Sequence, residues 1–110
     1  MADDTLSSLA AKIAARRTAA SDSSYTRQLL DGGPVKCARK FGEEAVETVI
    51  AALGEDDEAL KNEAADLLYH LLVLLQARNI ALDDVYKVLR ARMGQSGLAE
   101  KAARSRPRDD

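Results

Sequence analysis

Apolar residues recur every three to four positions through most of the chain, and short polar or glycine-containing segments interrupt this pattern. The spacing is typical of amphipathic α-helices, and the alternation that marks a half-buried strand is found nowhere. We therefore predict an all-α fold with helices at about residues 6–19, 25–30, 34–53 and 82–93. A further helix should start within GEDDEAL (54–60) and continue to about residue 78.

Proline, glycine and acidic residues mark the ends of the two central helices. Pro34 suits the first turn of the 34–53 helix, because its missing N–H would have no partner there anyway. Gly54 ends this helix, and Asp56 or Asp57 can cap the next one. A short loop thus joins the two helices, which should form an antiparallel hairpin within a bundle of four to five helices.

The apolar positions also predict which helix faces are buried. In the 34–53 helix, the residues that keep a period of three to four are Val35, Ala38, Phe41, Ala45, Val49 and Ala52. We expect this face to pack on the core. Residues 67–75 are apolar nearly all round, so this part of the next helix should be buried on most sides.

With 110 residues, the chain has room for one core. We expect a single all-α domain at residues 1–94, followed by a short helix and a frayed tail at residues 95–110. A helical domain of this size is only modestly stable alone and often completes its core by pairing. Homodimerisation is therefore expected.

Charge and composition narrow the class of protein. The formal net charge of −2 argues against a nucleic-acid partner, because such proteins carry a net basic face. The longest apolar stretch, LLVLL after His70, is far shorter than the roughly 20 residues of a membrane span. The opening MADDTLSS has no signal-peptide pattern, and the single Cys37 cannot form an internal disulfide. We expect a cytoplasmic protein without a membrane partner.

Two acidic patches are the candidate functional site. In KFGEEAVE (40–47), Glu44 and Glu47 are one helical turn apart with Glu43 beside them, and two lysines, Lys36 and Lys40, precede them on the same face. In NEAADLLYHLLVLL (62–75), a second pair of acids, Glu63 and Asp66, again stands three residues apart. In an antiparallel hairpin the two patches could face each other.

Four gathered carboxylates repel one another unless a cation lies between them. Mg²⁺ prefers oxygen ligands and commonly bridges to phosphates, and Lys36 and Lys40 could then hold phosphate oxygens. Mn²⁺ is a possible substitute, whereas di-iron carboxylate proteins use Glu-x-x-His, and here Asp66 stands three residues after Glu63. The alternative is that each acidic patch is an ordinary solvated helix face, and spacing alone leaves both interpretations open.

Four ordered segments resemble one known family: SYTRQLLDGG, KCARKFGEEAVETVIAA, NEAADLLYHLLVLL and IALDDVYKVLRAR. Together they are similar to the phosphoribosyl-ATP pyrophosphatases, which belong to the all-α, MazG-like nucleotide pyrophosphohydrolases. The resemblance covers about residues 6–93. It implies metal-binding roles for four acids and phosphate-binding roles for two lysines: Glu44, Glu47, Glu63, Asp66, Lys36 and Lys40.

The resemblance further implies a Mg²⁺-dependent homodimer. Its reaction would be hydrolysis of 1-(5-phosphoribosyl)-ATP to 1-(5-phosphoribosyl)-AMP and pyrophosphate, the second step of histidine biosynthesis. It implies catalytic roles for Glu43, Glu44 and Glu47, with Glu43 either orienting water or supporting the metal ligands. Two rivals remain: a house-cleaning pyrophosphohydrolase of non-standard nucleotides, which shares the acids, and a non-catalytic helical dimerisation module.

Other residues have simpler interpretations. His70 stands among leucines and is expected to be a core histidine, with Tyr69 as a core or interface residue. Tyr25 and Thr26 begin a short helix after Ser24, and the resemblance makes them candidate substrate-binding residues. Gly42 costs about 1 kcal/mol in mid-helix relative to alanine, so we expect close approach of a helix or of substrate there.

Overall fold

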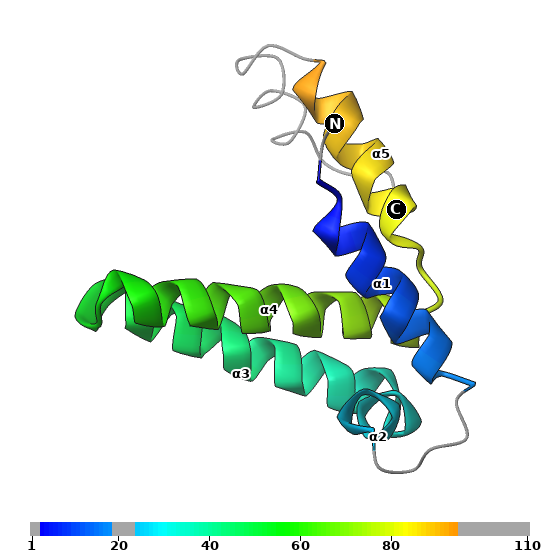
Figure 1. The fold of residues 1–110 in the computed structure, drawn as a ribbon, viewed down its shortest axis with the longest axis horizontal. Helices are drawn as coiled ribbons and strands as arrows, with labels where there is room; N and C mark the ends of the chain where they lie inside the picture. Colours follow the sequence, from blue (N-terminus) through cyan, green and yellow to red (C-terminus); the bar gives the residue numbers. More distant parts are fainter. Residues whose placement is uncertain (1–2, 19–23, 95–110) are drawn as a thin grey trace, which may run out of the picture. The chain divides into compact units, whose positions relative to one another are not determined.

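The computed structural model describes residues 3–18 and 24–94. This part of the chain folds into five helices without a strand (Figure 1): α1 (Thr5–Arg16), α2 (Tyr25–Asp31), α3 (Gly33–Gly54), α4 (Asp57–Ala77) and α5 (Leu82–Met93). The predicted all-α class is confirmed, and the helix ends lie within about three residues of those expected from the sequence.

Side-chain caps explain where three of the helices begin. The carboxylate of Asp56 accepts a hydrogen bond from the backbone N–H of Ala59, so Asp56 is the cap of α4. Asp4 and Ser24 cap α1 and α2 in the same way. Each cap satisfies an N–H that has no partner within its helix.

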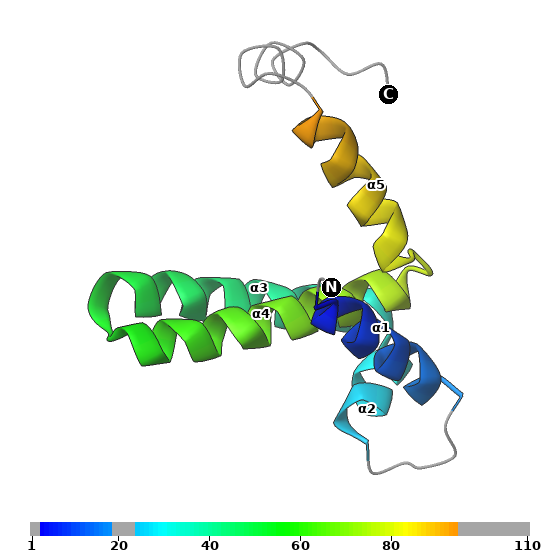
Figure 2. The same cartoon turned by 45° about the horizontal axis from the view of Figure 1, so that its top comes forward.

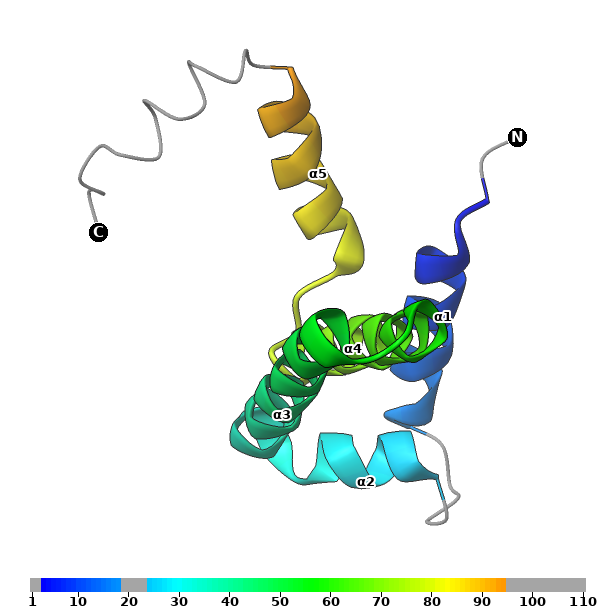
Figure 3. The ribbon, with the colours of Figure 1, turned by 90° about the vertical axis from the view of Figure 1, so that its left-hand side faces the viewer.

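Helices α3 and α4 form the predicted antiparallel hairpin, and they lie side by side along most of their length (Figures 1 and 2). Helix α1 packs against the C-terminal half of α4, and α2 packs against both α3 and α4 (Figure 3). The guanidinium of Arg17 donates to the carbonyl of Gln76 over 2.6 Å, which ties the end of α1 to the end of α4. These four helices make up one compact unit, Met1–Ile80.

The buried face of α3 matches the predicted one only in part. Cys37 and Ala51 are fully buried, whereas Val35 and Val49 are exposed. Phe41 and Ala45 of the predicted stripe are half-buried. Apolar residues lie around most of the circumference of α3, so the sequence pattern did not select the buried face correctly. The thiol of Cys37 donates to the carbonyl of Leu29.

The apolar run of α4 is buried only in part. Leu72 and Val73 belong to the core, together with Ile13 of α1 and Leu29 of α2. Leu68, by contrast, is 44% exposed. The other residues of this run are buried or half-buried, so the prediction that residues 67–75 are buried on most sides is wrong only at Leu68.

Helix α5 belongs to a second compact unit, Ala81–Asp110. Its first turn carries Asp83, whose carboxylate pairs with Lys87 at 3.6 Å and with Arg90 at 3.5 Å. The predicted short helix and tail at residues 95–110 lie outside the described residues. In the part of the chain that the structure describes, no helix is long and apolar enough to cross a membrane.

Candidate metal centre and active site

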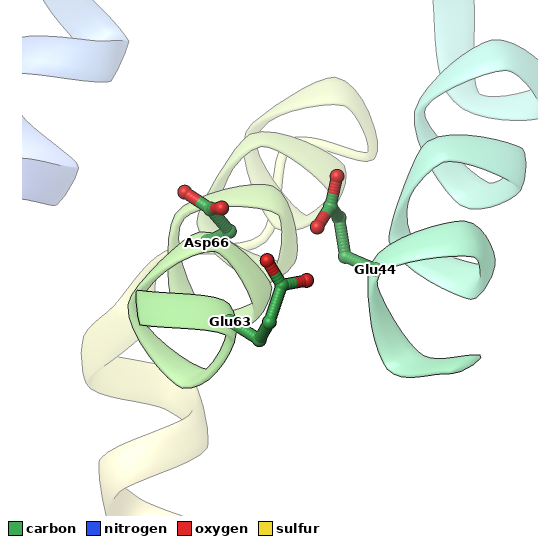
Figure 4. Close-up of side chains that lie close together, drawn as sticks. All are labelled: Glu44, Glu63 and Asp66. Carbon is green, nitrogen blue, oxygen red and sulfur yellow. The ribbon is translucent and has the colours of Figure 1, made fainter. Parts of the chain in front are cut away.

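Three of the four predicted metal ligands meet between the two hairpin helices. Glu44 projects from α3, Glu63 projects from α4 toward it, and Asp66 lies beside Glu63 on α4 (Figure 4). One carboxylate oxygen from each residue lies within 4.8 Å of the other two. This arrangement, which we call the acidic cluster, follows from i,i+3 spacing on α4 and from the antiparallel register that brings the Glu44 turn of α3 alongside.

Thr48 holds this register. Its hydroxyl lies 2.8 Å from the carbonyl oxygen of Glu44, one turn earlier in α3, and 3.3 Å from the carbonyl oxygen of Glu63 in α4. The single O–H can therefore be shared between the two turns that carry the carboxylates. The sequence interpretation missed this residue, because its significance depends on which face of α3 meets α4.

Burial makes it unfavourable for the carboxyl groups of the acidic cluster to be ionised. Desolvation, with the nearby carboxyls of Glu47, Asp66 and Glu63, raises the pKa of Glu44 to about 7. Desolvation also raises the pKa of Glu63, and the carboxyls of Glu47 and Asp66 add to this effect. Such shifts mark carboxylates that have no nearby cation to neutralise them.

Two oxygens of the cluster also lack partners. Oε2 of Glu44 and Oε2 of Glu63 are buried, and no described residue offers either one a hydrogen bond. Buried carboxylate oxygens without donors are unfavourable unless a cation takes them. With three carboxylates gathered and only oxygen atoms as donors, the site fits a hard divalent cation such as Mg²⁺.

Glu47, the fourth predicted ligand, lies at the edge of the cluster. Its side chain is exposed, and it is not among the three residues whose oxygens come together. Its carboxyl is nevertheless close enough to raise the pKa of both Glu44 and Glu63. A rotation of this exposed side chain would not disturb the core, so its role as a ligand remains a prediction.

A basic cavity of about 430 Å³ lies on the first half of α3. The predicted phosphate-binding residues Lys36 and Lys40 line it, together with Arg39 and Glu43. The ammonium group of Lys40 lies 3.5 Å from a carboxylate oxygen of Glu43, so the cavity is next to the acid that precedes Glu44 in the chain. Arg39 was missed, although its place in the 36, 39, 40, 43 helical pattern could have indicated it.

Aromatic side chains from α2 and α4 lie near the acidic cluster. Tyr25, which is 51% exposed, stacks on Tyr69 with ring centroids 6.4 Å apart. Tyr69 also shares a hydrogen bond between hydroxyls with Thr26. His70 is buried as predicted, and its Nε2 lies 3.9 Å from a carboxylate oxygen of Glu44. Burial lowers the pKa of His70, which favours the neutral ring.

Gly42 has open space around it. A Cβ added there would meet nothing within 4 Å. Close packing by another described helix is therefore not the reason for this glycine, and approach by substrate remains the other expectation.

Comparison with known proteins assigns this chain to a family. The family model described as phosphoribosyl-ATP pyrophosphohydrolase matches residues 6–93. The chain belongs to the phosphoribosyl-ATP pyrophosphohydrolase family. The match covers the range of the resemblance seen in the sequence, and it includes both helices of the acidic cluster.

Three relatives of this chain illustrate how closely it resembles the family. The phosphoribosyl-ATP pyrophosphatase of Ruegeria pomeroyi is 59% identical over 99 residues, which cover 90% of this chain and 94% of the relative. The protein of the same name from Nitrobacter winogradskyi is 57% identical, with coverages of 93% and 88%. That of Agrobacterium fabrum is 54% identical, with coverages of 94% and 96%.

Proposed function

We propose that this chain hydrolyses 1-(5-phosphoribosyl)-ATP to 1-(5-phosphoribosyl)-AMP and pyrophosphate, the second step of histidine biosynthesis. Membership of the phosphoribosyl-ATP pyrophosphohydrolase family supports this reaction. The acidic cluster is the single structural observation that carries it, because gathered carboxylates beside a basic cavity suit a metal-dependent reaction of a phosphoanhydride. The buried thiol of Cys37 suits a reducing compartment such as the cytoplasm.

Glu44, Glu63 and Asp66 would hold Mg²⁺, and Glu47 would join them by rotating its exposed side chain. Mn²⁺ has the same preference for oxygen ligands and could substitute. When bound, the ion would offset the negative charge that develops on the phosphate oxygens. The unpartnered oxygens of Glu44 and Glu63 support this assignment.

In the reaction, a water oxygen forms a bond to the α-phosphorus as the bond from this phosphorus to the α–β bridging oxygen breaks. The bridging oxygen keeps the electron pair of that bond and leaves as part of pyrophosphate. A carboxylate of the site accepts the proton of the water and releases it to solvent. Glu43 is suited to orient this water, because it lies between the acidic cluster and the basic cavity and is held by Lys40. Glu44 and Glu47 act beside it as ligands.

Substrate binding would use the basic cavity and the aromatic residues near the acidic cluster. Lys36 and Lys40 would contact the triphosphate, and Arg39 would add a planar guanidinium that suits phosphate oxygens. Tyr25 offers an exposed ring against which adenine can stack, and Thr26 is its neighbour in α2.

A substrate panel tests the reaction. We expect purified protein with Mg²⁺ to release pyrophosphate from phosphoribosyl-ATP with a kcat/KM far above that for any canonical or non-standard deoxynucleoside triphosphate. Equal or higher kcat/KM for a deoxynucleoside triphosphate would instead identify a house-cleaning enzyme. Absence of hydrolysis, together with absence of Mg²⁺ binding, would support a non-catalytic helical module.

A homodimer is the proposed assembly. On α3, the face that α4 leaves free carries an apolar stripe at i, i+3, i+4 and i+7: Val46, Val49, Ile50 and Leu53. All four are more than half exposed, and Leu53 is 85% exposed. A contiguous apolar stripe of this kind is typical of an interface rather than of a free surface. A second copy of the chain would cover it.

Sedimentation tests this assembly. We expect wild-type protein to sediment as a dimer, and Ile50→Asp or Leu53→Asp to shift it to the monomer. Ala52→Asp, an exposed position in the same turns but outside the apolar stripe, is the matched control. A monomeric wild type, or a dimer that tolerates both stripe variants, would contradict the proposal.

A further inference from the structure

A second cavity, of about 170 Å³, lies where α1, α2 and α4 meet. Its walls combine two cations of α1, two hydroxyl groups and two apolar side chains: Lys12, Arg16, Thr26, Tyr69, Leu9 and Ile13. None of the roles proposed above uses Lys12 or Arg16. The cavity is also separate from the basic cavity of α3, because the two share no lining residue.

The two cations have no partner among residues 3–18 and 24–94. Neither Lys12 nor Arg16 makes an ion pair or a hydrogen bond with any residue that the structure describes. They stand four residues apart on one helix, where like charges repel and destabilise the helix. Arg16 lies in the last turn of α1, where a cation interacts favourably with the helix dipole. Lys12 lies one turn earlier and lacks this stabilisation. An anion in the cavity would neutralise both.

The hydroxyl groups of the cavity are suited to the same kind of ligand. Thr26 and Tyr69 share one hydrogen bond, which uses one of their two O–H donors. The other O–H remains available to a ligand oxygen. Two cations and a hydroxyl donor around a cavity of this size match a phosphate monoester, and Leu9 and Ile13 can contact the carbon atoms of the group that carries it.

The cavity lies close to the acidic cluster. Tyr69 follows Asp66 by three residues on α4, which is about 4.5 Å of axial rise and places both on neighbouring parts of the helix surface. Tyr69 also packs against His70, with ring centroids 5.0 Å apart, and His70 reaches Glu44. The acidic cluster thus has one basic cavity beside α3 and a second one beside α1.

We propose that this second cavity binds the 5-phosphate of the phosphoribosyl arm of the substrate, with Lys12 and Arg16 as its charged contacts. The inference rests on the proposed function, because it assigns a part of that substrate. Phosphoribosyl-ATP carries phosphate at two ends, the triphosphate and the arm, and adenine connects them. A triphosphate at Lys36 and Lys40, adenine at Tyr25 and the arm at Lys12 and Arg16 would account for both cavities. The second cavity would then distinguish this substrate from nucleoside triphosphates that lack the arm.

Kinetics of two variants test this assignment. We expect Lys12→Gln and Arg16→Gln each to raise the KM for phosphoribosyl-ATP roughly tenfold or more, with kcat changed far less, because each removes a charged contact to phosphate. Both variants should weaken inhibition by ribose 5-phosphate by a similar factor and leave inhibition by pyrophosphate within about twofold of wild type. Lys61→Gln, an exposed cation of α4, is the matched control and should change none of these.

A binding measurement separates this proposal from the proposed function. In ¹⁵N-labelled wild-type protein, ribose 5-phosphate should shift the amide signals of residues around Lys12, Arg16 and Thr26, and pyrophosphate those of residues 32–43. This result does not depend on turnover. Ribose 5-phosphate that shifts only residues 32–43, or variants that weaken both inhibitors equally, would overturn the assignment, even if wild-type protein hydrolyses phosphoribosyl-ATP. If wild-type protein does not hydrolyse phosphoribosyl-ATP, the proposed function is refuted, whatever the binding measurement shows for the second cavity.

Discussion

Protons should compete with Mg²⁺ at Glu44. Burial and neighbouring carboxyls raise the pKa of Glu44 to about 7, so near neutral pH this group binds a proton in the folded protein and loses it on unfolding. Without metal, the free energy of unfolding should therefore fall as pH rises from about 4.5 to about 7 and then level off. Metal binding needs the ionised carboxylate, so Mg²⁺ affinity should rise across the same range.

The size of the effect follows from the pKa. A carboxyl with a pKa of about 7 is ionised in about one molecule in eleven at pH 6 and in about ten of eleven at pH 8. Mg²⁺ affinity should therefore increase about tenfold between these pH values through Glu44 alone. The raised pKa of Glu63 acts in the same direction.

Calorimetric titration with Mg²⁺ at several pH values checks this expectation, and the shift of Tm that Mg²⁺ produces provides a second readout. Glu44→Gln should bind Mg²⁺ weakly and should show a smaller fall of metal-free stability between pH 4.5 and 7, because only Glu63 then contributes. Glu58→Gln changes an exposed acid in the first turn of α4 and should behave as wild type. A wild-type Mg²⁺ affinity that does not change between pH 6 and pH 8 would refute the reasoning.

Three further substitutions test other parts of the account. Thr48→Val should lower the free energy of unfolding by about 1 kcal/mol and weaken Mg²⁺ binding, because it removes the hydroxyl between the Glu44 and Glu63 turns; Thr48→Ser should restore both in melting and titration experiments. Glu47→Gln should abolish turnover while circular dichroism shows unchanged helicity, and wild-type kcat in this variant would exclude Glu47 as a ligand. Gly42→Ala should raise the free energy of unfolding by about 1 kcal/mol in denaturant titrations, since a Cβ there meets nothing within 4 Å, and destabilisation would show an unrecognised contact.

Most of the acidic cluster could be predicted because local rules determine it. Glu63 and Asp66 stand three apart on one helix, and the short connection at Gly54 requires an antiparallel partner that brings Glu44 near them. Helix starts were predictable for a similar reason, since the cap at Asp56 is a contact within a single turn. Such features need no knowledge of how distant segments pack.

Features that depend on the choice between helix faces could not be predicted. Apolar residues surround most of α3, so periodicity did not show that Cys37 and Ala51 are buried while Val49 is exposed. The bridging position of Thr48 depends on the same choice. The cavity at Lys12 required the packing of three helices, because α1 provides its cations and other helices provide its hydroxyl groups.

Pyrophosphate release from phosphoribosyl-ATP by variants of α4 tests the central claim most directly. If the acidic cluster is the metal centre of a phosphoribosyl-ATP pyrophosphohydrolase, Glu63→Gln and Asp66→Asn should each lower kcat by at least about a hundredfold, since each removes a metal ligand. Both proteins should remain helical, and Glu58→Gln should retain wild-type kcat. Wild-type turnover by either Glu63→Gln or Asp66→Asn would contradict the claim that these carboxylates form the catalytic site.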